Sequence, residues 1–282
     1  MESIENIQEI KSLISLLDDP DPEIFSNVEQ EIIRRGTIML PFLEEAGARS
    51  DDKLMQDRIR KVVHLIHYTN TRAKLARWVT VGQDNLLLGA LIIAKYQYPE
   101  LKEEHIIRKL GFITQDIYLR IKEHMTPMEK VRIINSVLYD DYEFYGNKRD
   151  YQSPQCSYIN MVIDTGRGNH LSLGMLYILV ARSLGVPIAG VDLQDYFFLG
   201  YQEEGKMLFY INPFSRGNTL TQSELLFFLK LAEVDVQKDR IEAASNLDII
   251  RRLIITLAEA YQKLGKPDKA QELNGLLEET NL

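Results

Sequence analysis

The feature that most constrains this fold is a stretch of fourteen residues, 171–184, that is apolar on nearly every side. A helix that is hydrophobic all round must be enclosed by other parts of the protein. Residues 171–184 therefore predict a central buried helix. The Gly-Val-Pro sequence that follows, ending at Pro187, predicts a turn directly after it.

Three short apolar or aromatic runs come after this helix, at residues 187–193, 196–201 and 207–211. Each run has the length and composition of a strand, and the Gln-Glu-Glu-Gly sequence at 202–205 predicts a hairpin turn between the last two. We therefore expect a small antiparallel sheet beside the buried helix. Thr221, with Glu224 three residues later, predicts the capped start of another helix.

Most of the remaining chain is predicted to be helical, apart from an ordered loop at residues 140–154. Apolar residues recur at helical spacing before and after the Asp-Asp-Pro-Asp-Pro sequence at 18–22, and again over residues 52–67, 84–98, 102–110 and 112–125. Helix, proline turn and helix at the start resemble one HEAT-type unit. Residues 248–277 predict a helical hairpin that resembles one tetratricopeptide unit, and a single unit of this kind favours a packing element over a peptide-binding array.

Composition narrows the classes of function. The chain of 282 residues is 45% hydrophobic and 26% charged, with a net charge of −8. The acidic balance argues against nucleic-acid binding. The most apolar stretch, residues 86–94, is too short to span a bilayer, so we expect a cytoplasmic protein without a membrane partner. Cys156 is the single cysteine, which excludes an internal disulfide and a multi-thiolate metal site, and we expect no cofactor.

Three motifs resemble the SirB-type branch of the transglutaminase-like superfamily. The first is the loop and short helix at residues 144–160, FYGNKRDYQSPQCSYIN. The second is RGNHLSL at 167–173, followed by the Leu-Gly and Pro of the turn. The third is YINPF at 210–214. The resemblance covers residues 85–281. It implies a mostly helical α+β fold with a papain-like core, in which the buried helix packs on a small antiparallel sheet.

The resemblance and the helical patterns together predict three parts. Residues 1–82 form a helical, HEAT-like N-terminal region. Residues 83–235 form the transglutaminase-like domain with a helical lead-in, and residues 236–282 form the tetratricopeptide-like hairpin.

The superfamily's catalytic triad is Cys, His and Asp, and this chain departs from it at each matched position. His170 stands where the enzymes have Cys, and where this branch commonly has Pro. Tyr196 stands at the His position and Asn212 at the Asp position. A Tyr, with a pKa of ~10, cannot accept and return a proton near neutral pH as an imidazole does. The resemblance therefore implies former triad positions and no catalytic residue among them.

Two function classes follow. The leading hypothesis is a catalytically inactive transglutaminase-like protein that acts as a binding or regulatory module for a protein or peptide partner, since both helical ends favour protein partners. The alternative is a cysteine-dependent peptidase or amidase in which Cys156 pairs with His170. A packing role for Cys156 is the simpler interpretation, and Ser172 suits helix capping better than nucleophilic chemistry. The sequence predicts no oligomeric state.

Overall fold

The computed structural model describes residues 2–193, 196–234 and 241–282. One predicted feature, the domain boundary after residue 235, lies outside the described residues. The chain divides into two compact units, Met1–Lys74 and Leu75–Leu282.

The unit Met1–Lys74 is built from helices joined by short turns. It contains α1 (Glu2–Ser15), α2 (Pro22–Arg35), α3 (Leu40–Arg49) and most of α4 (Lys53–Arg77), with 3-10 turns at Leu16–Asp18 and Gly36–Met39. Apolar side chains on the inner helix faces form one core, in which Leu17, Ile32, Met39, Leu43 and Val62 are fully buried.

Local sequence explains the ends of α2. Asp21 accepts a hydrogen bond from the Glu23 amide at the start, Pro22 occupies the first turn, and Gly36 follows the end with a positive φ of 71°. The prediction for α4 was wrong at its end, since the helix continues ten residues beyond His67 to Arg77. No Gly or Pro stands between them to stop it.

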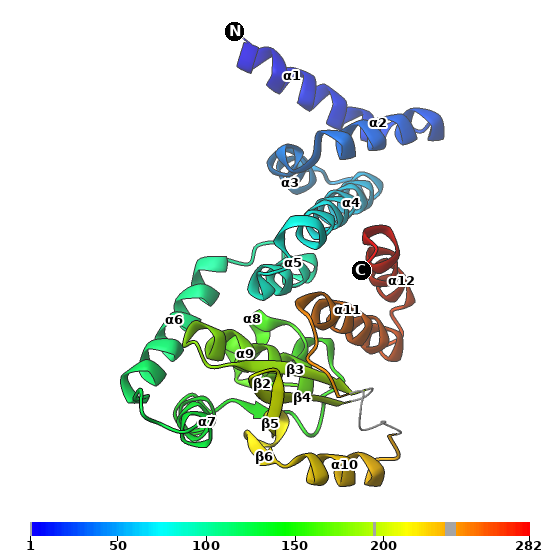
Figure 1. Cartoon of the computed structure of the whole chain (residues 1–282). Coiled ribbons are helices and arrows are strands. Elements are labelled where there is room, and N and C mark those ends of the chain that lie inside the picture. Colours follow the sequence, from blue (N-terminus) through cyan, green and yellow to red (C-terminus); the bar gives the residue numbers. More distant parts are fainter. Residues whose placement is uncertain (1, 194–195, 235–240) are drawn as a thin grey trace. The chain divides into compact units, whose positions relative to one another are not determined.

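The unit Leu75–Leu282 contains a helical majority and two small sheets (Figure 1). Its helices are α5 (Leu86–Gln97), α6 (Glu103–Arg120), α7 (Pro127–Asn135), α8 (Ile159–Thr165), α9 (His170–Ser183), α10 (Gln222–Leu231), α11 (Asn246–Lys263) and α12 (Pro267–Thr280). The stretch predicted as two helical segments between residues 102 and 125 is the single helix α6. No described helix combines the length and the apolarity needed to cross a bilayer.

The main sheet is antiparallel, with the strand order β3-β4-β5-β6. Its strands are β3 (Ile188–Leu193), β4 (Tyr196–Glu203), β5 (Lys206–Asn212) and β6 (Asn218–Leu220). Glu204 and Gly205 both have positive φ in the predicted turn between β4 and β5. A second pair, β1 (Tyr145–Gly146) and β2 (Arg167–Gly168), is parallel and very short. The sequence analysis did not predict β1, β2 or β6.

Helix α9 is the centre of this unit. Ten of its fourteen residues are buried, and it packs on β3 and β4, where a Cβ added to Gly174 would lie 2.6 Å from the Phe197 ring. Glycine at this position therefore allows the helix to lie close to the sheet. The predicted fold class, α+β with a buried helix on a small antiparallel sheet, is confirmed.

The C-terminal helices are joined to this core by polar contacts. The Tyr261 hydroxyl of α11 lies 3.1 Å from that of Tyr158 and donates to Gln97 at 2.7 Å. Arg182, at the end of α9, donates to the Asn246 side chain at 2.7 Å. These contacts place α11 where it can line a site on α9.

Candidate functional site

The start of α9 is fixed by a buried capping box. The Asn169 side chain accepts from the Ser172 amide at 2.9 Å, and Ser172 Oγ accepts from the Asn169 amide at 3.0 Å. Ser172 Oγ also donates to the Cys156 carbonyl at 2.6 Å, and Asn169 Nδ2 donates to Ser157 Oγ at 2.8 Å. These bonds tie the loop that precedes α8 to the helix start. Ser172 is thus a structural residue, as its position in the sequence indicated.

His170, the first residue of α9, lies within a group of aromatic rings. It stacks on Phe214 with ring centroids 4.1 Å apart, and it meets the edges of Tyr196 at 5.5 Å and Tyr151 at 6.3 Å. Its Nδ1 atom is buried without a hydrogen-bond partner. Burial lowers the pKa of His170 to about 4, so the imidazole is neutral at neutral pH.

Asn212 ends β5 and uses its side chain for the local turn. Its Oδ1 atom accepts from the amides of Phe214 at 3.1 Å and Ser215 at 3.2 Å, as the cap of the short 3-10 turn Pro213–Ser215. The Asn212 side-chain oxygen is therefore already occupied. The same turn holds Phe214 against His170.

His170, Tyr196 and Asn212 line one cavity of about 710 Å³, which we call the cleft. Residues from the loop after β1, the start of α9, β4, the end of β5, α10 and α11 surround it. Its charged lining residues are Lys148, Arg252, Glu259 and Lys263. The structure thus brings His170, Tyr196 and Asn212 together in one cavity.

Cys156 occupies a separate buried position. Its thiol donates to the Asp150 carbonyl at 3.3 Å and accepts from Asn147 Nδ2 at 3.4 Å. Burial raises the pKa of the thiol, which disfavours the reactive thiolate. Cys156 is not among the residues that line the cleft, and in the described part of the chain no hydrogen bond joins its sulfur to His170.

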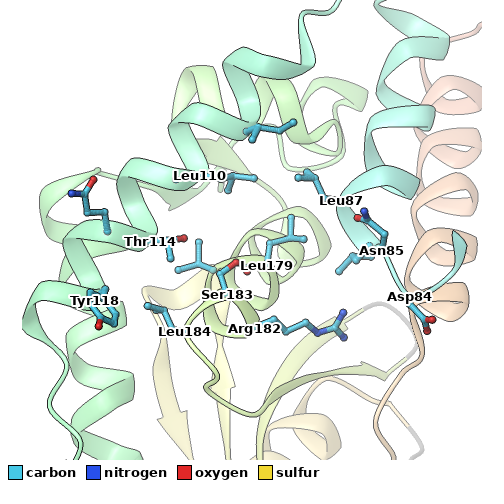
Figure 2. A pocket seen from close by; sticks show the side chains of 15 residues that line it. Asp84, Asn85, Leu87, Leu110, Thr114, Tyr118, Leu179, Arg182, Ser183 and Leu184 are labelled. Atoms are coloured by element: carbon cyan, nitrogen blue, oxygen red, sulfur yellow. Dashed lines mark hydrogen bonds between the residues drawn. The ribbon is translucent and has the colours of Figure 1, made fainter.

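A second and larger cavity, which we call the groove, lies along α5, α6 and the last turns of α9 (Figure 2). It has a volume of about 870 Å³ and a mostly apolar lining that includes Leu110, Leu179 and the exposed Tyr118. Asp84 and Arg182 are its charged residues, and Arg182 is bonded to a neutral amide. This lining provides a mostly apolar contact surface.

Sequence reasoning did not identify two parts of the cleft. Phe214 and Tyr151 were visible in the motifs, but their stacking around His170 depends on tertiary packing. The wall formed by α11, with Arg252, Glu259 and Lys263, comes from a segment that the sequence analysis assigned to a separate hairpin. Within the described residues, no group of three His, Cys, Asp or Glu side chains is placed to hold a metal ion.

Residues 104–255, more than half of the chain, match the family described as the transglutaminase-like superfamily. The chain belongs to this superfamily. The matched segment begins in α6 and ends in α11, so it contains the whole of α9 and the main sheet together with Cys156, His170, Tyr196 and Asn212.

Several curated proteins are similar to the chain at modest identity. A UPF0162 protein of Xylella fastidiosa (strain 9a5c) is 27% identical over 191 residues, which cover 66% of this chain and 68% of that protein. A UPF0162 protein of Vibrio cholerae is 24% identical over 178 residues, or 62% of this chain and 66% of that protein. Mouse F-box only protein 21 is 36% identical over 103 residues, or 34% of this chain but 16% of that protein. No solved structure matches the chain.

Proposed function

We propose that this protein is a catalytically inactive, SirB-type member of the superfamily, in which the cleft at the start of α9 binds a peptide segment of a protein partner. The observation that carries the proposal is the meeting of His170, Tyr196 and Asn212 in one cavity. These are the positions at which the resemblance to the enzymes expects Cys, His and Asp.

The chemistry of the three side chains supports inactivity. A nucleophilic thiol at a helix start depends on a neighbouring imidazole that takes its proton. Here the first residue of α9 is a neutral imidazole, and the side chain of Tyr196 near it is a phenol. The Asn212 side-chain oxygen accepts hydrogen bonds from two backbone amides of a turn, so it does not orient a catalytic base. His170, Tyr196 and Asn212 therefore do not form a pair of nucleophile and general base.

The geometry also supports binding. A cavity of about 710 Å³ is within the range of sites that hold ligands, and half-buried rings with a few polar groups are typical of such sites. The 103-residue similarity to a small part of the much longer F-box only protein 21 supports use of such a segment as a module within a larger protein. The HEAT-like and tetratricopeptide-like ends favour protein partners.

The second candidate, a peptidase or amidase that uses Cys156 with His170, is less well supported. The Cys156 thiol is buried, its pKa is raised, and both of its hydrogen bonds are to other groups. The two candidates separate in one experiment on the purified full chain. Amide hydrolysis and acyl transfer are measured with a labelled peptide and a labelled amine, for the native protein and for Cys156→Ala.

The proposal expects no turnover above background for either protein, and alkylation of Cys156 by iodoacetamide more slowly than that of free cysteine at neutral pH. Turnover that disappears in Cys156→Ala would establish the second candidate. Turnover that persists in Cys156→Ala would contradict both.

A further inference from the structure

The lining of the cleft has the opposite electrostatic character to the chain as a whole. The chain carries a net charge of −8, whereas the lining includes three cations, Lys148, Arg252 and Lys263, and one carboxylate, Glu259, among the described residues. His170 is neutral at neutral pH and does not change this balance. A concave surface of one sign attracts ligands of the other sign.

Two of these cations are available to a ligand. Lys148 and Lys263 are exposed, and no acidic group within the described residues pairs with either. Arg252 lies 3.9 Å from Asp192, at the long limit for an ion pair, so its charge is only partly balanced. An unpaired cation at the rim of a cavity is a ready partner for a carboxylate, since no existing ion pair has to break.

The polar groups inside the cleft add donors. Because Asn212 Oδ1 accepts two backbone hydrogen bonds, the side-chain N–H groups are what Asn212 has left to offer a ligand in the cleft. The Tyr196 hydroxyl has no recorded partner within the described residues and is also available. These groups and the three cations can all donate hydrogen bonds, which suits a ligand rich in carboxylate and carbonyl oxygens.

The interior of the cleft is aromatic. Tyr196 meets Phe228 edge-on at 5.2 Å and His170 at 5.5 Å, and both tyrosine and histidine are only partly buried. Rings in this arrangement offer an apolar, flat surface to an inserted side chain. The cleft thus combines an apolar centre with cations at its rim.

We propose that the cleft selects acidic peptide segments, in which carboxylates flank an aromatic or branched apolar side chain. The apolar side chain contacts Tyr196 and Phe228, and the carboxylates meet Lys148 and Lys263. This preference rests on the proposed function of the cleft as a peptide-binding site and adds the class of peptide to it.

The test is a selection from a library of short random peptides displayed on phage, with three forms of the full chain as bait. The first is the native protein and the second carries Lys148→Glu with Lys263→Glu. The third carries Lys206→Glu with Lys230→Glu, which makes the same change in net charge at exposed positions outside the cleft. Thermal unfolding checks that all three are folded, and anisotropy with labelled selected peptides gives their affinities.

The proposal expects peptides enriched in Asp and Glu around an apolar residue. Their affinity is expected to fall at least about tenfold in the Lys148 and Lys263 double variant, and less than about twofold in the control. Peptides that bind the native protein and compete with one another, but show no acidic bias and bind the double variant equally well, would overturn this inference and leave the proposed function standing. If no peptide is selected by any of the three forms, the proposed function fails together with the inference.

Discussion

Helix α9 borders a cavity at each end, and the two differ in what surrounds them. The cleft at its start has a volume of about 710 Å³ and gathers His170, Tyr196, Asn212 and three cations. The groove at its end is larger, about 870 Å³, and its lining surface is mostly apolar (Figure 2). Size would favour the groove as the functional site. Convergence of polar and aromatic groups from distant parts of the chain favours the cleft.

The difference follows from how the two ends of α9 are built. At the start, a buried capping box, a 3-10 turn and α11 hold side chains from separate segments in fixed positions. At the end, the cavity is bounded by α5 and α6, and its lining includes the exposed side chains of Ile107 and Tyr118. Rigid support around a few polar groups is what a recognition site requires.

The largest effect is expected at the start of α9, where His170 makes the stability of the protein depend on pH. The pKa of His170 is about 4 in the folded protein and about 6.5 when unfolded. The unfolded chain therefore takes up a proton first as the pH falls, and the folded protein loses up to about 3 kcal/mol of stability between pH 6.5 and pH 4. Urea unfolding of the native protein and His170→Gln across this range measures the effect.

The variant is expected to lose that part of the pH dependence, since glutamine does not titrate. An equal slope in the two proteins would show that His170 is not buried and neutral. Direct titration of the His170 ring by NMR provides a control that is independent of unfolding.

A smaller difference is expected for two serines at opposite ends of α9. Ser172→Ala removes a buried hydroxyl that accepts from Asn169 and donates to the Cys156 carbonyl, and we expect a loss of about 2 kcal/mol in unfolding free energy. Ser183→Ala removes an exposed hydroxyl bonded within its own helix, with an expected change within about 0.5 kcal/mol. Equal effects in denaturant unfolding would contradict the claim that the start of the helix is the more rigid end.

The smallest effect is expected in peptide affinity, when one tyrosine in each cavity is replaced by alanine. Tyr196→Ala in the cleft is expected to weaken binding of a selected peptide by about tenfold, because a partly buried ring in contact with a ligand contributes on this scale. Tyr118→Ala in the groove, where the ring is 70% exposed, is expected to leave it unchanged. The reverse result in an anisotropy titration would move the binding site to the groove.

Much of the fold was predictable because local patterns determine it. The buried helix α9, the strands at the apolar runs after it, and the Thr221 and Glu224 capping box each form as predicted. His170 and Asn212 could be selected as candidate site residues because the motifs around them are short and contiguous. The end of α4 could not be predicted, since no residue there breaks a helix.

The rest of the cleft depends on contacts between residues far apart in the sequence, which local patterns do not predict. Phe214 stacks on His170 from 44 residues along the chain, and Lys263 reaches the same cavity from α11. Neither position has a local signal, because a ring after proline and a lysine at a helix end are both ordinary. Only the packing of the hairpin on the core brings them to the site.

The most direct test of the account is to restore the triad. Because Cys156 is the single cysteine, Cys156→Ala combined with His170→Cys, Tyr196→His and Asn212→Asp leaves one thiol, at the start of α9. The control is Cys156→Ala with His170→Cys alone. The pH dependence of alkylation by iodoacetamide gives the pKa of each thiol. The account predicts a pKa of about 7 or lower in the restored variant and of about 8.5 or higher in the control, because only the restored variant has an imidazole beside the thiol. Equal pKa values in two folded variants would contradict the assignment of His170, Tyr196 and Asn212 as the former triad positions.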